Sequence, residues 1–216
     1  ASNPAATTPR EYLGGTPSWR TDLYAGRGTL MTLRDSIRLN RKLGVRHVPE
    51  LKSGDTARIQ RTFGGQAQYA QRLVDAYRDE GIDPRDVWLQ SFDERDIRYW
   101  LKEEPEFGRR AILLDDVDPG SAPPVPRLRP DELRDLHRAG LRTIAPPIGA
   151  LLAVDDAGSL LPSGYARELR ASGFDIIAWS LERSDLRYGV RADDFYYSFE
   201  GAGRAIRGDA DLYAVL

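Results

Sequence analysis

The sequence predicts an α/β fold in which parallel strands alternate with helices. Apolar runs typical of buried strands recur near residues 46–52, 87–92, 110–115, 141–145 and 174–181. Amphipathic segments with helix-start and helix-stop residues separate these runs, and this alternation indicates βαβ units and a parallel sheet. Polar residues end several of the runs. Such ends are typical of a barrel whose functional site lies at the carboxyl-terminal rim of its strands.

Composition restricts the class of protein. The chain has 216 residues, enough for one large or two small domains, and its net charge is -2. This balance predicts no strong attraction to nucleic acid or to a membrane surface. No apolar run is long enough to span a membrane. The absence of cysteine excludes disulfides, thiolate zinc sites and cysteine nucleophiles.

The first strand follows an irregular segment and one helix. Residues 1–29 carry several Pro and Gly residues and are expected to form a loop-like segment. Thr32 can cap a helix that stops at Gly44, and the strand near 46–52 follows at once. The polar, glycine-bearing residues 53–66 then predict a long loop at the carboxyl end of this strand.

Start and stop residues mark the later helices. Asp93 can cap one helix, and Pro130 stands in the first turn of another, where proline is well tolerated. The helices expected after the first strand are Ala67–Glu80, Glu94–Glu104, Pro130–Gly140 and Ser163–Ser172. Residues 117–127 are expected to be a Pro-rich loop, and a short helix is expected near 200–206.

The strand near 46–52 carries the candidate functional residues. Because side chains alternate along a strand, Glu50 and Lys52 share one face and His47 lies on the other. Lone buried charges are costly, so the charged pair should lie at a wet strand end. The carboxylate of Glu50 could bind a divalent metal, and Lys52 could neutralise a phosphate oxygen. From these residues alone, a surface ion pair is the alternative.

Five short segments occur in order and together cover nearly the whole chain. They are residues 16–24, 28–32, 49–52 (Pro-Glu-Leu-Lys), 87–93 (Val-Trp-Leu-Gln-Ser-Phe-Asp) and 178–184 (Ala-Trp-Ser-Leu-Glu-Arg-Ser). In this order they resemble the glycerophosphodiester phosphodiesterase family, in particular its bacterial branch with a long insertion. The resemblance implies a TIM-type (β/α)8 barrel that is incomplete here, with strands three to seven present. Residues 1–29 would be the tail of the insertion, and 30–216 a partial barrel domain.

The resemblance also implies an activity and a site. The family hydrolyses glycerophosphodiesters to an alcohol and glycerol 3-phosphate with a divalent metal, Ca²⁺ or Mg²⁺. Glu50 matches a metal ligand of the family, and Lys52 matches the catalytic lysine that contacts the phosphate. Trp179 matches a tryptophan of the substrate pocket, and Gln90 and Phe92 fall beside that pocket as substrate-binding residues. Relatives of this branch are often exported, which favours a periplasmic or secreted protein.

The chain departs from the family pattern at several points. The His-Arg-Gly strand, the Glu-x-Asp metal ligands, the second catalytic histidine and the last strand have no match here. The chain alone is therefore expected to be nearly inactive and, with open strand edges, prone to aggregate. Two other functions stay open. One is a catalytically inactive barrel that acts as a binding module, and the other is a related barrel phospholipase.

Five further side chains are weaker candidates. His47 should point toward the helices, and His137 stands in the last turn of a helix, where it can interact with the terminal carbonyls. Asp115 and Asp116 could add to a metal site or form a solvated strand end. Arg183 could meet a phosphate or form an ion pair at the rim.

Overall fold

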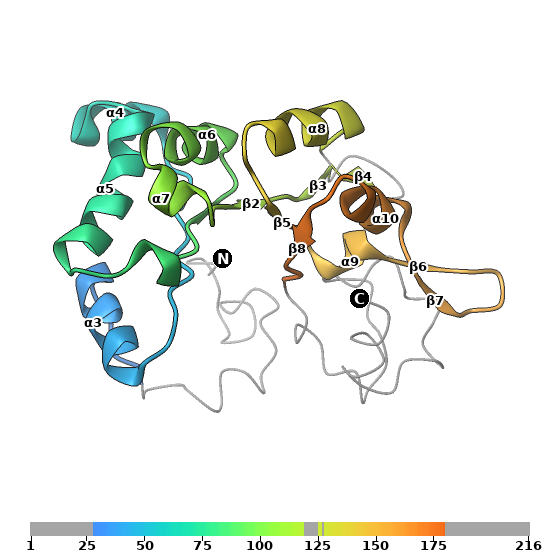
Figure 1. Cartoon of the computed structure of the whole chain (residues 1–216), viewed down its shortest axis with the longest axis horizontal. Helices are drawn as coiled ribbons and strands as arrows, with labels where there is room; N and C mark the ends of the chain where they lie inside the picture. Colours follow the sequence, from blue (N-terminus) through green and yellow to red (C-terminus); the bar gives the residue numbers. More distant parts are fainter. Residues whose placement is uncertain (1–27, 119–124, 127, 180–216) are drawn as a thin grey trace, which may run out of the picture. The chain divides into compact units, whose positions relative to one another are not determined.

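The computed structural model describes residues 28–118, 125–126 and 128–179 (Figure 1). The chain divides between Thr32 and Leu33 into two units, and every element named below belongs to the second. The predicted insertion tail, residues 1–29, lies almost wholly outside the described residues. Arg183 and the helix expected near 200–206 also lie outside them.

Four strands form a parallel sheet, in the order β1-β2-β5-β8. The strands are β1 (Gln90–Ser91), β2 (Ile112–Leu114), β5 (Thr143–Ala145) and β8 (Asp175–Ile176). Each pairs in parallel with the strand before it, so that Gln90, Ile112, Thr143 and Asp175 lie side by side across the sheet. The prediction of an α/β fold with a parallel sheet is therefore confirmed, although the strands are shorter than predicted.

The predicted strand near 46–52 is reduced to two isolated bridges beside β1. These parallel bridges are His47–Val87 and Glu50–Gln90. Between them, the Gln90 N–H donates to the carbonyl of Pro49 at 2.9 Å, and the Leu51 N–H donates back to Gln90 at 2.9 Å. Because proline has no N–H, the ladder loses one bond at Pro49. A single residue thus interrupts a strand that otherwise keeps its parallel register.

The helices predicted within the described residues are confirmed, with ends that differ by a few residues. They are α3 (Leu33–Leu43), α5 (Gln66–Asp79), α6 (Glu94–Glu103), α8 (Pro130–Arg138) and α10 (Gly164–Ala171). Asp93 caps α6 by accepting a hydrogen bond from the Arg95 N–H at 2.9 Å. Ser163 caps α10 in the same way, through the Ala166 N–H at 3.0 Å. Local capping chemistry therefore marks the starts of α6 and α10.

The prediction of a long loop over residues 53–66 is wrong. This stretch contains helix α4 (Thr56–Phe63). Asp55 accepts a hydrogen bond from the Arg58 N–H at 2.6 Å, and Gly64 ends the helix with φ of 89°. The glycine near the end of this segment is therefore a helix terminator, as left-handed glycines commonly are.

Short elements fill the remaining connections. They are η1 (Pro84–Asp86), α7 (Pro105–Gly108) and α9 (Ile148–Leu151), with the antiparallel pairs β3 (Val117–Asp118) with β4 (Val125–Pro126), and β6 (Leu152–Val154) with β7 (Leu160–Pro162). Pro105 follows α6 and also opens α7, since proline suits a first helical position. The pair β3–β4 lies within the segment predicted to be a Pro-rich loop. None of the helices in the described ranges is both long and apolar enough to cross a membrane.

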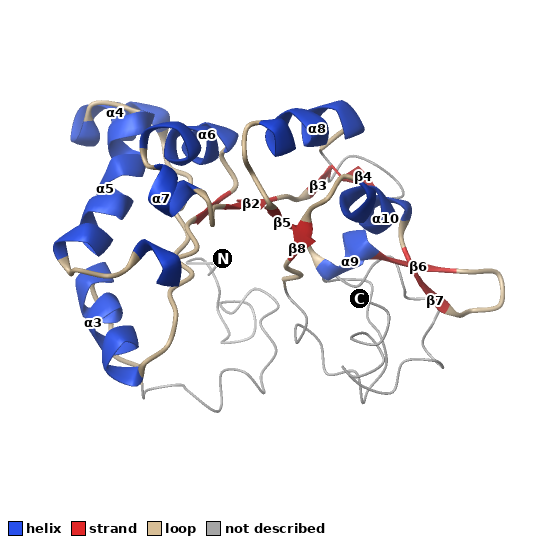
Figure 2. Ribbon diagram, in the orientation of Figure 1, coloured by secondary structure: helices blue, strands red, loops and turns tan. Residues whose placement is uncertain are grey.

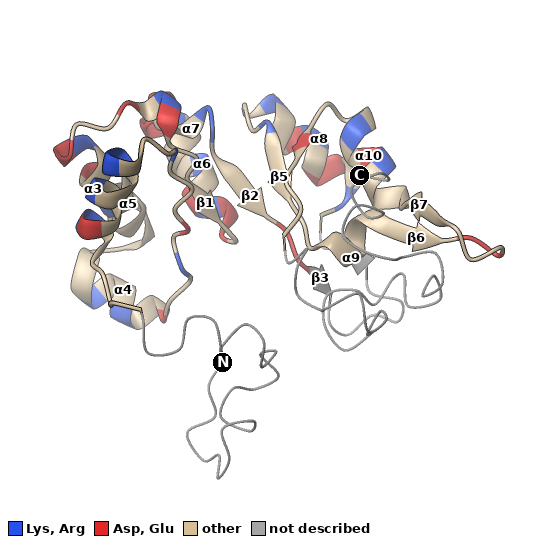
Figure 3. Cartoon of the chain, turned by 90° about the horizontal axis from the view of Figure 1, so that it is seen from below, with Lys and Arg blue, Asp and Glu red and all other residues tan. Residues whose placement is uncertain are grey.

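The two central strands, β2 and β5, are buried on both faces. On one face Leu113 and Ile144 pack in a core with residues of α5, α6, α8 and α10, and Figure 2 shows α6 and α8 on the same side of β2 and β5. On the other face Ile112, Leu114 and Ala145 form a second cluster. Figure 3 shows charged residues on the helices and none on β2 or β5. Strands buried on both faces are typical of parallel sheets.

Candidate functional site

A charged pair lies at the carboxyl end of the edge segment. The ammonium of Lys52 is 2.7 Å from Oε2 of Glu50. The side chain of Glu50 is 21% exposed and that of Lys52 is 76% exposed. Exposed ion pairs contribute little to stability, typically about 0.2–1 kcal/mol. Because Lys52 is mostly exposed and Glu50 is partly exposed, a ligand can reach both charges, as the predicted wet strand end implies.

Gln90 lies directly beside Glu50, because the two residues form one of the bridges to β1. Its side-chain amide donates to the carbonyl of Val48 at 3.3 Å. The amide of Gln90 thus reaches back to the edge segment two residues before Glu50. Phe92 follows two positions later, where alternation returns the chain to the same face of the sheet.

Phe92 and Trp179 form an aromatic pair. Their ring centroids are 6.1 Å apart and the rings are nearly perpendicular, at 85°, an arrangement that aromatic quadrupoles favour. The indole N–H of Trp179 donates to the carbonyl of Ala145 at 2.7 Å, which fixes the ring beside the end of β5. Phe92 is 41% exposed, so this pair presents an apolar surface to solvent.

The structure therefore brings the five predicted site residues into two groups at the carboxyl ends of the strands. Glu50, Lys52 and Gln90 form a polar group at the edge segment and β1. Phe92 and Trp179 form the aromatic group, in which Trp179 packs against the cluster of Ile112, Leu114 and Ala145. The residue types suit a ligand that carries both an anionic and an organic part.

A pocket of about 480 Å³ adjoins the charged pair. Besides Glu50 and Lys52, its lining includes Phe63, Tyr69 and Arg72. Sequence reasoning did not associate these three residues with the site. No local pattern links Tyr69 and Arg72 of α5 to Lys52, and helix α4, which carries Phe63, was expected to be a loop. The capping position of Asp55 was the signal that could have revealed this helix.

Glu50 can supply one oxygen ligand to a divalent metal. Mg²⁺ is commonly held by one or two carboxylates together with substrate phosphates, whereas Ca²⁺ takes six to eight oxygens. No group of three or more His, Cys, Asp or Glu side chains suited to a metal occurs among residues 28–118, 125–126 and 128–179. Glu50 therefore fits a partial metal site, to which other oxygen ligands must contribute.

Asp115 is not the solvated strand end that was one of its two predicted environments. It is 5% exposed, and one of its oxygens accepts a hydrogen bond from the Tyr165 hydroxyl at 2.5 Å. Its other oxygen accepts from the Asp116 N–H at 2.8 Å. Burial, with a smaller effect of the nearby Asp115 carboxylate, raises the pKa of Tyr165. These contacts fasten the end of β2 to α10.

Neither histidine lies at the polar group. His47 faces the helices as predicted: it is 2% exposed, and its ring lies edge-on to Tyr77 of α5 with centroids 5.2 Å apart. Burial lowers the pKa of His47, and the carboxylate of Asp86 partly opposes this effect. His137 packs edge-on against Phe174, with ring centroids 5.3 Å apart. Both histidines therefore have structural roles in the described part of the chain.

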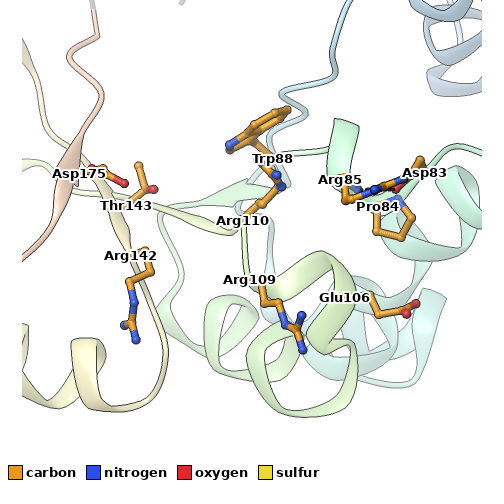
Figure 4. Close-up of a pocket in the computed structure, with 10 residues that line it drawn as sticks. All are labelled: Asp83, Pro84, Arg85, Trp88, Glu106, Arg109, Arg110, Arg142, Thr143 and Asp175. Carbon is orange, nitrogen blue, oxygen red and sulfur yellow. Dashed lines mark hydrogen bonds and ion pairs between the residues drawn. The ribbon is translucent and has the colours of Figure 1, made fainter.

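A second pocket, of about 570 Å³, lies at the amino-terminal ends of the strands. Figure 4 shows Arg110 against Trp88, and the guanidinium lies 4.7 Å from the ring centroid. Arg85 pairs with Asp83 at 2.6 Å, and Arg142 donates to the carbonyl of His137 at 2.8 Å. Charges of both signs line this pocket, and three of its arginines already have partners. We therefore assign it a structural role.

Fold and site together define an α/β protein with a parallel sheet and a polar, aromatic group at the carboxyl ends of its strands. No family model matches the chain. It is 39% identical over 219 residues to a protein of Arthroderma benhamiae described as "Extracellular protein". The alignment covers 99% of this chain and 86% of the fungal protein. The chain belongs to the same family as this fungal protein.

Proposed function

We propose that the chain carries part of a site that binds and hydrolyses phosphodiesters, with glycerophosphodiesters as substrates and Ca²⁺ or Mg²⁺ as cofactor. One observation carries the proposal. Lys52 and Glu50 lie 2.7 Å apart at a strand end, on the sheet face where Phe92 and Trp179 form their aromatic pair. The resemblance of Pro49-Glu50-Leu51-Lys52 to the phosphodiesterase motif points to the same pair.

A barrel is part of this proposal. The strand order β1-β2-β5-β8 follows the chain order without reversal, and the edge segment at residues 47–51 precedes β1 in the same sense. Doubly wound sheets reverse their order at a switch point, whereas barrel strands follow one another in sequence. The described order therefore supports a (β/α)8 barrel with its site at the carboxyl-terminal rim.

The side chains have distinct roles in this proposal. A phosphodiester is an anion, and the ammonium of Lys52 stabilises the charge that grows on its non-bridging oxygens. Glu50 supplies one ligand to a divalent ion, which polarises a phosphoryl oxygen when it is bound. Phe92 and Trp179 contact the organic part of the substrate, and Gln90 can donate to a substrate oxygen. Proton transfer falls to a group other than His47 and His137.

A binding module is the second candidate function. The placement of the two histidines favours it, because His47 packs on Tyr77 and His137 on Phe174, away from the polar group. In such a module Lys52 and the aromatic pair would bind a phosphodiester without turnover. A barrel phospholipase would use the same Glu50 and Lys52 with a different head group.

We also propose that the protein is extracellular. The support is the description of its fungal relative as an extracellular protein, over an alignment that covers nearly all of this chain. Export of the natural protein in its host, followed by immunoblotting of culture medium and cells, tests this proposal.

The experiment for the activity uses the purified natural protein, because the catalytic histidines of the phosphodiesterase family have no match in this chain. Its substrates are glycerophosphocholine and bis(4-nitrophenyl) phosphate, in Mg²⁺, in Ca²⁺ and in EDTA. We expect hydrolysis that requires the metal and is lost in Lys52→Ala and Glu50→Gln. Lys102→Ala is the matched control, because Lys102 also forms an exposed 2.7 Å ion pair, with Glu103 of α6. Binding of glycerophosphocholine without turnover, measured by calorimetry, would instead support the binding module.

A further inference from the structure

The backbone of Lys52 is held by a side chain from outside its own segment. The last hydrogen bond from this segment to β1 is made by the Leu51 N–H. One residue later, the hydroxyl of Tyr69 in α5 donates to the carbonyl of Lys52 at 3.2 Å. We propose that Tyr69 is a positioning residue that fixes the ammonium of Lys52 beside Glu50. This inference rests on the proposed function of Lys52 but can be tested without it.

Tyr69 is itself fixed by the corner between α4 and α5. Its ring packs against Phe63, the last residue of α4, with centroids 4.8 Å apart, and its N–H donates to the carbonyl of Gly65 at 3.0 Å. Gly64 and Gly65 have φ of 89° and 141°, values at which side chains other than glycine are strained. Two glycines thus set the turn that brings Phe63 against Tyr69.

Lys52 needs such support because its side chain is long and 76% exposed. A lysine side chain has many rotamers, so the position of the Lys52 ammonium depends on its backbone and on Glu50. Tyr69 supplies the backbone anchor, and Glu50 supplies the contact at the ammonium. Displacement of a catalytic group by about 1 Å can cost as much as 10²-fold in rate. A hydroxyl that touches no substrate can therefore matter for turnover.

Competitive acetylation tests the positioning directly, because the chain has only three lysines, Lys42, Lys52 and Lys102. Trace acetic anhydride labels them in proportion to the accessibility and charge state of each amine, and mass spectrometry gives the ratio of Lys52 to Lys102. Tyr69→Phe removes the hydroxyl and keeps the ring on Phe63. We expect this ratio to rise about two- to tenfold, the equivalent of one lost hydrogen bond.

Tyr99→Phe is the matched control. Tyr99 donates a hydrogen bond of 2.6 Å to Gln71, in the layer of α5 and α6, so this variant loses a comparable bond elsewhere. The ratio should stay constant in Tyr99→Phe, and the melting temperature of Tyr69→Phe should remain close to that of the wild type. An unchanged ratio in Tyr69→Phe overturns the proposal. Equal increases in both variants also overturn it, because they reveal general loosening.

Kinetics separate this inference from the proposed activity. If the wild type hydrolyses a phosphodiester, Tyr69→Phe should lower kcat about tenfold and leave KM nearly unchanged, since Lys52 acts on charge in the transition state. A fall in kcat of equal size in Tyr99→Phe counts against positioning. If the wild type hydrolyses none, the proposed activity fails, and the acetylation ratio alone decides whether Tyr69 positions Lys52.

Discussion

Glu50 accepts a hydrogen bond from Lys52 at 2.7 Å and lies beside Gln90 in parallel register. Glu50 thus belongs both to the ion pair with Lys52 and to the parallel bridge with β1. The backbone of Glu50 is fixed by β1, whereas the ammonium of Lys52 extends into solvent. This difference predicts that changes at Lys52 alter function far more than stability.

Lys52→Ala should lower phosphodiesterase turnover by about 10²–10³, the usual effect of losing one group that stabilises developing charge. Because the side chain is 76% exposed, the melting temperature should change little. Steady-state kinetics and thermal unfolding check both statements on one sample. Near-normal turnover in Lys52→Ala, beside an unchanged Lys102→Ala control, would contradict the assignment of Lys52.

Asp96 should be important for stability, because it is 1% exposed and accepts two side-chain hydrogen bonds. The donors are Gln66, at 2.7 Å, and the fully buried Ser91, at 2.8 Å. Asp96→Ala leaves both donors without their acceptor, which should destabilise the protein by about 1–3 kcal/mol or more. Urea unfolding measures the change. Asp135→Ala, at an exposed helix position, is the control and should have little effect.

The same carboxylate predicts a dependence of stability on pH. Burial raises the pKa of Asp96 above its usual value of 3.8, although the hydrogen bonds from Gln66 and Ser91 oppose this effect. The folded state therefore binds the proton of Asp96 more readily than the unfolded state does. The stabilisation that this proton adds is full below pH 3.8 and is lost as pH rises through the pKa of Asp96 in the folded state. Urea unfolding from pH 4 to 7 should show this loss in the wild type. Asp96→Asn, which cannot ionise, should lack it.

His47 predicts the opposite dependence. Burial lowers its pKa below the usual 6.5, so the unfolded state takes up the proton first. Stability should be full above pH 6.5 and should decrease as pH falls from 6.5 toward the lower folded pKa. His47→Phe keeps an aromatic edge on Tyr77 and removes the titration. The melting temperature of His47→Phe should fall less than that of the wild type between pH 7 and 5.5. If the two melting temperatures fall equally with pH, His47 is not the cause of the pH dependence.

Gly108 should not tolerate a methyl group. A Cβ at this position in α7 would lie 2.3 Å from the carbonyl oxygen of Trp100 and 2.7 Å from the Cα of Leu101. Both are backbone atoms of α6, so relief requires a shift of the helix, and Gly108→Ala should cost about 1–3 kcal/mol or more. Gly164→Ala is the control, since its nearest contact is an arginine nitrogen 4.0 Å away. It should be neutral or slightly stabilising.

Helix positions were predictable because their signals are local. Asp93 and Ser163 each cap a helix from the residue before it, and Gly81 follows α5 with a positive φ. The same reasoning failed for residues 53–66, where glycine was interpreted as a loop former. Asp55 and Gly64 are in fact the two ends of α4. The polar composition of residues 53–66 suggested a loop, whereas the spacing between the capping Asp55 and the terminating Gly64 fits a helix of two turns.

The candidate site was predictable only in part. Alternation correctly placed His47 on the face opposite Glu50, because it depends only on the extended backbone. The contact between Phe92 and Trp179 crosses two intervening strands, and no local pattern links residues so far apart in sequence. The hydrogen bond from Tyr69 to Lys52 depends on the turn between α4 and α5, so it could not be predicted while α4 was missed.

The sequence by itself determined the alternation of helices and strands, the approximate positions of most helices, and the face on which each strand residue lies, since these follow from neighbouring residues. Only the tertiary structure decided which strands pair, that Pro49 interrupts the edge segment, and that Asp115 is buried against Tyr165. Pairing and burial depend on packing between segments distant in sequence, where the free energy of many contacts outweighs local preference. The environment of Asp115 illustrates this: two successive acids at a strand end suggested solvent or a metal, and a tyrosine fifty residues away supplied its partner.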